Sequence, residues 1–183
     1  MSDYAREHIE DYVDLATHNN YEGLLAKGMT KEQALYEINR TSRENARTPM
    51  QWTDGRNAGF TTGTPWLKVN PNYSSINAAA QVKDADSVYS FYKKMIALRK
   101  DPGYKETIVY GSLEPVWEER HNLMAYYRKG ERTLLVVGNY QREPQEIELP
   151  QMYKKALLNN YKDITEDEGV VKLQGYQVLV LEI

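Results

Sequence analysis

The first 42 residues read as helical and polar. Asn19 and Asn20 are of a type that caps helix N-termini, and Gly28 suits the position just after a helix. The pattern therefore predicts a short helix that these asparagines cap and that ends near Gly28.

A second helix is predicted directly after the first. Thr30 and Gln33 have the spacing of a capping box, in which the two side chains satisfy backbone N–H groups at the start of a helix. The helix is expected to run to about Arg40, with Leu35 and Ile38 on its inner face.

A longer amphipathic helix is predicted after Asp86, which is expected to cap it, and Asp101-Pro102-Gly103 is expected to end it. Lysines occupy its solvent side. Its apolar face consists of Val88, Phe91, Tyr92, Met95 and Ile96, with Arg99 at the end of the same face. Such a face needs a partner surface.

Beyond residue 104 the pattern changes to short strands separated by turn signals, which predicts an antiparallel β-sandwich of about 80 residues. Lys129-Gly130-Glu131 reads as a hairpin turn, and the apolar run 134–137 reads as a strand buried on both faces. The expected strands are residues 106–110, 116–118, 123–128, 133–139, 145–149, 155–158, 169–173 and 176–182.

Between these regions, residues 43–83 are rich in Gly, Pro, Asn and Thr and show no sustained period. A loop of this length inside a compact domain is usually functional. Pro49 disfavours helix at Thr48, so the chain is expected to become extended there. Four aromatic residues of the loop need a surface or a ligand to pack on: Trp52, Phe60, Trp66 and Tyr73.

Residues 42–52 of this loop combine two arginines, two side-chain amides and a tryptophan. Guanidinium groups offer planar donors to carboxylates or to vicinal hydroxyls, and an aromatic ring can stack on a sugar. Arg43 and Arg47 are therefore candidate substrate-binding residues. The alternative is structural, with Arg47 pairing with a carboxylate and Trp52 in a core.

The same run resembles a known signature. It reads Ser42-Arg43-Glu44-Asn45-Ala46-Arg47-Thr48-Pro49-Met50-Gln51-Trp52. This is similar to the signature of the oligo-1,6-glucosidase branch of glycoside hydrolase family 13, the α-amylase superfamily, which has Asp in place of Glu44. The resemblance continues through residues 57–63, 65–73 and 87–100, and extends over nearly the whole chain.

The resemblance implies an α+β organisation. Residues 1–103 are expected to form the helical and loop excursion after the eighth strand of a (β/α)8 barrel together with the last barrel helix. Residues 104–183 are expected to form a C-terminal antiparallel β-sandwich. A complete barrel needs about 250 residues, so a chain of 183 residues looks like the C-terminal third of such an enzyme.

The resemblance also implies a function. Family members of this branch are retaining α-glucosidases that cleave α-1,6 bonds at the non-reducing ends of short gluco-oligosaccharides. For the parent enzyme of this chain, α-1,4 bonds are a further candidate. Their catalytic carboxylates come from earlier barrel strands, so no catalytic residue is assigned here and the chain alone is expected to be inactive. Arg43 is expected to contact the substrate, and Asn45 and Gln51 to satisfy backbone groups of the loop.

One position departs from the family pattern in a way that bears on specificity. Ala16 stands where enzymes favouring α-1,6 linkages carry a Glu that holds the second sugar. Alanine offers no acceptor to a sugar hydroxyl, so the resemblance implies an altered preference at that subsite.

The composition of the chain limits which partners, metals and cofactors are expected. The net charge of -3 favours neither nucleic acid nor anionic membranes as partners. The chain has no cysteine, and its three histidines lack metal-ligand spacing, so neither metal nor cofactor is expected. These features and the lack of a signal-like N-terminus favour a cytoplasmic location.

A second function class stays open. A β-sandwich with a helical arm also suits a non-catalytic carbohydrate-binding or scaffold module. The apolar face of the helix at 87–100 is expected to lie against a barrel, and in this chain alone it invites self-association.

Overall fold

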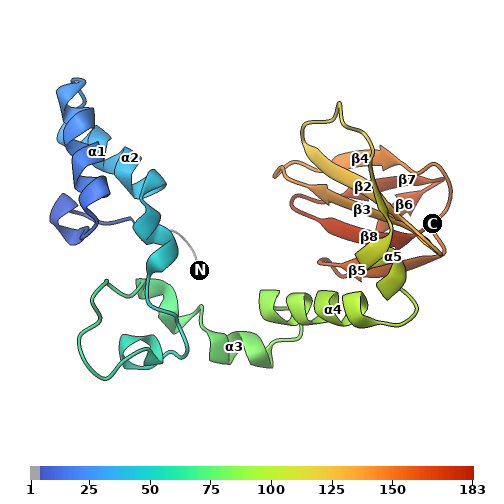
Figure 1. The fold of residues 1–183 in the computed structure, drawn as a ribbon, viewed down its shortest axis with the longest axis horizontal. Helices are drawn as coiled ribbons and strands as arrows, with labels where there is room; N and C mark the ends of the chain where they lie inside the picture. Colours follow the sequence, from blue (N-terminus) through green and yellow to red (C-terminus); the bar gives the residue numbers. More distant parts are fainter. Residues whose placement is uncertain (1–4) are drawn as a thin grey trace. The chain divides into compact units, whose positions relative to one another are not determined.

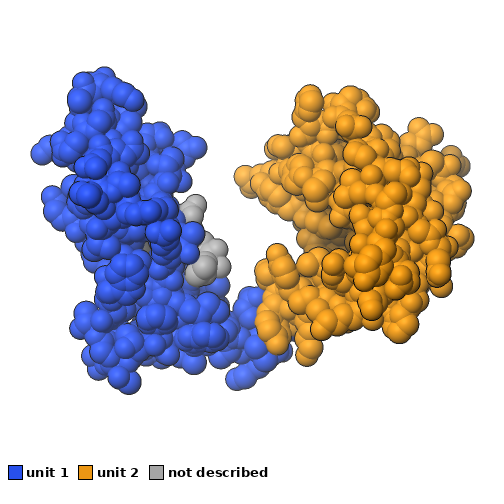
Figure 2. Space-filling model, in the orientation of Figure 1, with its two compact units in different colours: residues 1–85 blue, residues 86–183 orange. Residues whose placement is uncertain are grey.

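The computed structural model describes residues 5–183. The described residues fall into two compact units, one that ends at Ala85 and one that comprises Asp86–Ile183 (Figure 2). The sequence predicts a domain boundary after residue 103, which would assign the preceding helix to the barrel. Compactness groups that helix with the sheets instead. The boundary after residue 103 concerns the domains of the family and stays a prediction.

The N-terminal unit is helical, with a long segment of short turns after its second helix (Figure 1). Its elements are η1 (Ile9–Asp11), α1 (Leu15–Ala26), α2 (Lys31–Thr41), η2 (Arg43–Arg47), η3 (Arg56–Gly59), η4 (Pro71–Ser74) and α3 (Ala78–Lys83). The segment 43–83 is therefore divided by three 3-10 turns, and the sequence did not predict α3.

Helices α1 and α2 pack around a small core of Tyr12, Tyr21, Ala34 and Ile38. The predicted capping box of α2 is confirmed, because Thr30 and Gln33 bond each other's backbone N–H groups.

The predicted cap of α1 was wrong. Asp14 is the N-cap, with Oδ2 accepting from the backbone N–H of Thr17 at 3.1 Å, and Asn19 and Asn20 lie inside the helix. Asp14 lies five residues before Asn19, and its carboxylate accepts from a backbone N–H group that would otherwise be free at the start of the helix. The helix therefore begins directly after Asp14.

The segment after α2 is held by internal hydrogen bonds. Asn57 and Ala58 adopt left-handed backbone conformations, with φ of 52° and 56°. The carbonyl of Ala58 accepts from the backbone N–H groups of Trp52 at 2.8 Å and Thr53 at 3.0 Å. These bonds fold the chain back on itself directly after the arginine-rich run.

The C-terminal unit combines two helices with two antiparallel sheets. One sheet has the order β1-β2-β3-β8-β5 and the other β4-β7-β6. Helices are α4 (Val88–Lys100) and α5 (Lys105–Tyr110), and strands are β1 (Ser112–Pro115), β2 (Leu123–Lys129), β3 (Thr133–Asn139), β4 (Gln145–Glu148), β5 (Lys155–Asn159), β6 (Thr165–Asp167), β7 (Val170–Leu173) and β8 (Val178–Glu182).

The two sheets share one core, which makes this unit a sandwich. Leu135 and Val137 of β3 and Leu179 of β8 belong to the same buried cluster as Val171 and Leu173 of β7. The predicted hairpin turn is confirmed, because Lys129 pairs with Thr133 across β2 and β3. Leu134, on the opposite face of β3, is fully buried as well, in agreement with the expected burial on both faces.

Several predictions for this unit were wrong. Residues 106–110 form helix α5, because local β-branched residues were outweighed by tertiary contacts: Thr107 is buried and Arg128 donates to the carbonyl of Ile108 at 3.0 Å. Residues 116–118 lie after β1, and β6 was not predicted. The side chains of Tyr110 and Tyr176 are exposed.

Helix α4 begins one residue later than predicted, because Ser87 caps it through a bond from the N–H of Ser90 at 3.1 Å. No residue of α4 is buried. Its Phe91 and Met95 face the outer surface of the five-stranded sheet across a cavity of about 580 Å³. Val88 and Tyr92 lie largely in solvent, with 67% and 57% exposure.

Gly111, between α5 and β1, is expected to be intolerant of a side chain. A Cβ there would lie 2.6 Å from the carbonyl oxygen of Lys129 and also against that of Thr107. Gly111→Ala should lower the free energy of unfolding of the C-terminal unit by about 1–3 kcal/mol, measured by chemical denaturation. Gly23→Ala is the control: it is unobstructed inside α1 and should stabilise the N-terminal unit by about 0.5–1 kcal/mol. Equal effects of the two changes would contradict the steric account.

Glu182 is expected to make the C-terminal unit sensitive to acid. Its carboxylate accepts from the Tyr104 hydroxyl at 2.9 Å and from Arg132 at 2.5 Å, and these bonds hold its pKa below the ordinary value of 4.5. A carboxyl whose pKa is lowered by folding stabilises the fold above its unfolded-state pKa, and that stabilisation is lost as the pH falls through the folded-state pKa.

Glu182→Gln should therefore lower stability at pH 7 and reduce the pH dependence of unfolding below about pH 5. The matched control is Glu148→Gln on the exposed side of β4, which should leave that dependence unchanged. Thermal unfolding at a series of pH values measures both. Parallel curves for wild type and Glu182→Gln would contradict the prediction.

Candidate functional site

The arginine-rich run begins as a short 3-10 helix, η2, that Ser42 caps. The Ser42 hydroxyl accepts from the N–H of Glu44 at 3.3 Å and lies 3.0 Å from the hydroxyl of Thr17 on α1. Thr48 is extended, with φ of -59° and ψ of 149°, as the following proline requires. The predicted end of the helical turn at Thr48 is confirmed.

Arg43 is the first residue of η2 and forms an ion pair with Asp14, the N-cap of α1. The hydrogen bond from this guanidinium is the main reason why the pKa of Asp14 lies below its usual range. The Arg43 side chain remains 58% exposed, so its other N–H groups are accessible to a ligand. Because the pair is exposed, screening by solvent keeps its contribution to stability small.

Arg47 ends η2 and is exposed. Within residues 5–183 no ion pair to a carboxylate is formed by Arg47, so the described part of the chain does not supply the partner that a structural role would need. Arg47 remains a candidate substrate-binding residue by prediction.

Glu44 is the residue of this region that sequence reasoning missed. It is 2% exposed, and its carboxylate accepts from Arg6 at 2.6 Å and from the backbone N–H groups of Val13 at 2.8 Å and Asp14 at 2.5 Å. The guanidinium of Arg6 also lies over the Tyr12 ring, 4.1 Å from its centroid. One feature of the sequence could have drawn attention to Glu44: it is the single position at which residues 42–52 depart from the family signature, which has Asp there.

The amides of the run hold the loop as predicted. Asn45 donates to the backbone carbonyl of Asn39 at 2.7 Å, and Gln51 donates to that of Ile76 at 2.7 Å. Trp52 does not lie in a core, as the structural alternative would require: 52% of it is exposed, and Trp66 is exposed as well.

Ala16 lies in the first turn of α1, two residues after Asp14, and its side chain is exposed. This places the departure from the family pattern next to the partner of Arg43. His18, on the same helix, bonds through Nε2 to the backbone carbonyl of Tyr12 at 2.7 Å, which agrees with a local structural role.

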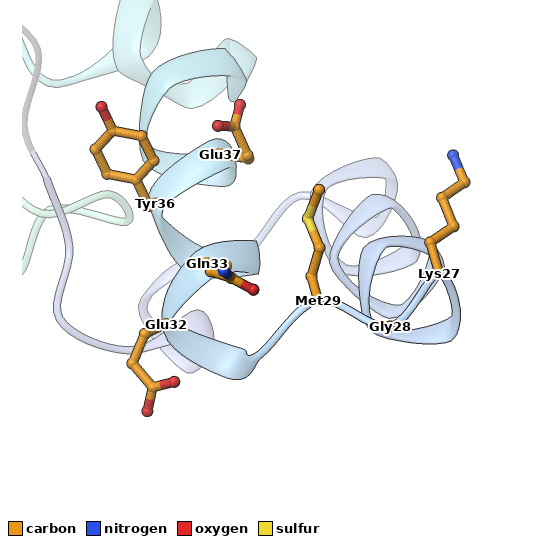
Figure 3. Close-up of a pocket in the computed structure, with 7 residues that line it drawn as sticks. All are labelled: Lys27, Gly28, Met29, Glu32, Gln33, Tyr36 and Glu37. Atoms are coloured by element: carbon orange, nitrogen blue, oxygen red, sulfur yellow. The ribbon is translucent and has the colours of Figure 1, made fainter.

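A separate hollow of about 530 Å³ lies where α1 turns into α2 (Figure 3). Met29 projects from the turn between the two helices, and most of the other side chains around the hollow come from α2. None of the predicted site residues lines it. Its lining residues are Lys27, Gly28, Met29, Glu32, Gln33, Tyr36 and Glu37.

Among residues 5–183, no group of three or more His, Cys, Asp or Glu side chains is arranged to hold a metal ion. None of the helices in that range has the length and apolar character to cross a membrane.

Comparison with known families defines the class of the chain. Residues 16–111 match the α-amylase catalytic domain, and residues 123–180 match the C-terminal domain of the α-amylase SusG. The first match covers more than half of the sequence. The chain therefore belongs to the α-amylase family, glycoside hydrolase family 13, as its arginine-rich run predicts.

Relatives within the family narrow the resemblance. The oligo-1,6-glucosidase of Bacillus cereus is 38% identical over 189 residues, which include 100% of this chain and 33% of that protein. The glucan 1,6-alpha-glucosidase of Streptococcus pneumoniae is 34% identical over 99% of this chain and 34% of its own length. This chain thus spans about a third of the length of these relatives.

Solved structures give the same picture. The trehalose-6-phosphate hydrolase of Bacillus licheniformis matches the whole chain with a TM-score of 0.90 and 33% identity, over 34% of its length. The trehalulose synthase of Pseudomonas mesoacidophila matches with a TM-score of 0.88 and 35% identity, over 33% of its length. The fold is therefore shared with enzymes whose names denote different reactions, one a hydrolase and the other a synthase.

Proposed function

We propose that this chain is the C-terminal part of a retaining α-glucosidase that cleaves α-1,6 bonds at the non-reducing ends of short gluco-oligosaccharides. The observation that carries the proposal is the exposed guanidinium of Arg43, fixed by Asp14 at the start of the arginine-rich run. The names of the relatives, oligo-1,6-glucosidase and glucan 1,6-alpha-glucosidase, support the linkage. Cleavage of α-1,4 bonds belongs to the same proposal.

In this function Arg43 binds and orients the terminal glucose, and Arg47 lies on the same wall of the site. A rigid fork of N–H donors matches two neighbouring hydroxyl oxygens, so it fixes the sugar ring as well as holding it. The nucleophile and the acid of a retaining glycosidase stand about 5 Å apart on either side of the bond. We place both in the part of the relatives that this chain does not span, and we assign no catalytic residue here.

The experiment compares two proteins on an aryl α-glucoside. One is the 183-residue chain. The other is a chimera in which the two thirds of the Bacillus cereus relative that this chain does not match are joined ahead of Met1. The proposal predicts turnover by the chimera and none by the chain. Turnover by the purified chain, or an inactive chimera that is folded, would count against it.

The competing function is a non-catalytic module that binds glucan through the sandwich. The expected mark of such a module is a row of exposed aromatic rings on the strands. The exposed tyrosines Tyr140, Tyr161 and Tyr176 lie in loops between strands, and the exposed tryptophans Trp52 and Trp66 belong to the N-terminal unit. Calorimetric titration of the chain with isomalto-oligosaccharides separates the two functions. Saturable heat from the isolated chain would favour the module, and its absence favours the enzyme part.

The proposed setting is cytoplasmic, with gluco-oligosaccharides as substrates and with neither nucleic acid nor membrane as a partner. The lack of cysteine favours the cytoplasm, the net charge of -3 argues against nucleic acid and anionic membranes, and the names of the relatives support the substrates. No metal and no cofactor enters the proposed reaction, since glycosidic hydrolysis through two carboxylates requires neither.

The exposed apolar stripe of α4 is expected to make the isolated chain self-associate. Val88, Tyr92 and Ile96 follow one another at helical spacing and are 67%, 57% and 49% exposed. Replacing Tyr92 and Ile96 by Ser should shift the chain toward monomer in analytical ultracentrifugation. Replacing Lys93 and Lys100 by Ser is the matched control. A wild-type chain that is monomeric at high concentration would contradict this prediction.

A further inference from the structure

The buried carboxylate of Glu44 has no part in the proposed function, yet it joins three segments of the N-terminal unit. One oxygen accepts from Arg6, and the other accepts from the backbone N–H groups of Val13 and Asp14. A buried carboxylate needs such partners, because removing it from water without them is costly. These bonds therefore fix the course of residues 13–14 beside η2.

The same contacts determine where the ion pair of the site is formed. Asp14 begins α1, and its side chain reaches both Thr17 and Arg43. Arg43 directly precedes Glu44 on η2. Glu44 thus holds both members of the Asp14–Arg43 pair. It binds the backbone N–H of Asp14, and it is the neighbour of Arg43 on η2.

We infer that Glu44 is a positioning residue that aligns Asp14 with the guanidinium of Arg43 and so presents Arg43 to the glucosyl group. The role of Arg43 toward sugar rests on the proposed function; the alignment does not. The oxygen that accepts from Val13 and Asp14 performs the alignment. The oxygen that accepts from Arg6 anchors the N-terminal segment.

A purely structural role makes a different prediction. If Glu44 only anchors the N-terminal segment through Arg6, its loss should lower the stability of the unit and leave the pairing of Arg43 with Asp14 unchanged. Two substitutions separate these roles. Glu44→Ala removes both oxygens. Glu44→Gln keeps one acceptor oxygen for the backbone N–H groups, and it turns an amide donor toward the donor of Arg6.

The test is NMR on the 183-residue chain without sugar. It records the guanidinium signals of Arg43, hydrogen exchange at the amides of Val13 and Asp14, and thermal unfolding. Glu37→Gln is the control, because this half-buried residue of α2 pairs with Arg40 and not with Arg43 or Asp14. In Glu44→Ala the two amides should exchange at least about tenfold faster and the guanidinium signals of Arg43 should lose their ion-paired pattern. In Glu44→Gln the amide exchange rates and the Arg43 signals should stay close to those of the wild type, while the unfolding temperature falls.

Two results would overturn the inference. One is a folded Glu44→Ala chain in which the Arg43 signals are unchanged. The other is loss of the Arg43 pairing in Glu44→Gln, which would assign the alignment to the bond with Arg6, and this result does not depend on whether Glu44→Ala folds. Because no substrate is present, these results are independent of the chimera experiment. A failed alignment and a failed glucosidase function are therefore distinguishable.

Discussion

Arg43→Met in the chimera is expected to lower kcat/KM for an aryl α-glucoside by about 100-fold or more. The substitution keeps much of the side-chain length and removes every N–H donor. Hydrogen bonds to a charged group contribute about 1.5–3 kcal/mol each, and two of them correspond to roughly 10²- to 10⁴-fold in kcat/KM. Steady-state kinetics over a range of substrate concentrations provides the measurement.

The matched control for Arg43 is Arg40→Met. Arg40 is an exposed arginine of α2 whose ion-pair partner is Glu37 at 3.7 Å. Its substitution removes the same charge three residues away and should change kcat/KM by less than about twofold, since exposed ion pairs contribute little. If Arg43→Met and Arg40→Met behave alike, Arg43 does not bind the substrate.

Ala16→Glu in the chimera should raise the turnover of isomaltose relative to maltose by about tenfold. The added carboxylate accepts hydrogen bonds from the hydroxyls of the second sugar, which Ala16 does not, and one charged hydrogen bond accounts for a factor of this size. Competition between the two disaccharides measures the ratio directly.

The new carboxylate in Ala16→Glu also lies in the first turn of α1, where negative charge is favourable, so the fold should tolerate it. Asn19→Glu places the same charge one turn further along the exposed side of α1 and serves as the control. An unchanged ratio in Ala16→Glu, or an equal change in both variants, would show that this position does not set the linkage preference.

The sequence predicted features that depend on neighbouring residues. The capping box of Thr30 and Gln33, the hairpin after Lys129 and the end of the helical turn before Pro49 all follow from local rules, and all three are confirmed. The short strands and turn signals beyond residue 104 predicted the antiparallel sandwich, and the apolar run 134–137 predicted a strand buried on both faces.

Features that depend on distant contacts were missed. The bond of Glu44 to Arg6 joins residues 38 positions apart, and no local pattern marks it. Helix α5 looks like a strand because of its β-branched residues, whereas its place is set by the contact of Ile108 with Arg128. The start of α1 was misplaced because polar and apolar residues are mixed around this helix, which gives little contrast between its faces.

At the candidate site, too, some features were predicted from the sequence and others depend on distant contacts. The resemblance of residues 42–52 singled out Arg43, and the structure places its guanidinium on Asp14 in the adjoining helix. The exposure of Trp52 could not be derived from the chain, because burial of a single aromatic residue depends on which surface covers it.

The central claim is that Arg43 touches the terminal glucose of the substrate. A crystal structure of the chimera with glucose bound tests it most directly. The account predicts a guanidinium nitrogen of Arg43 within about 3 Å of a glucose hydroxyl oxygen, the distance of a hydrogen bond. A bound glucose with the Arg43 guanidinium turned away, beyond hydrogen-bond reach of every hydroxyl, would contradict the account.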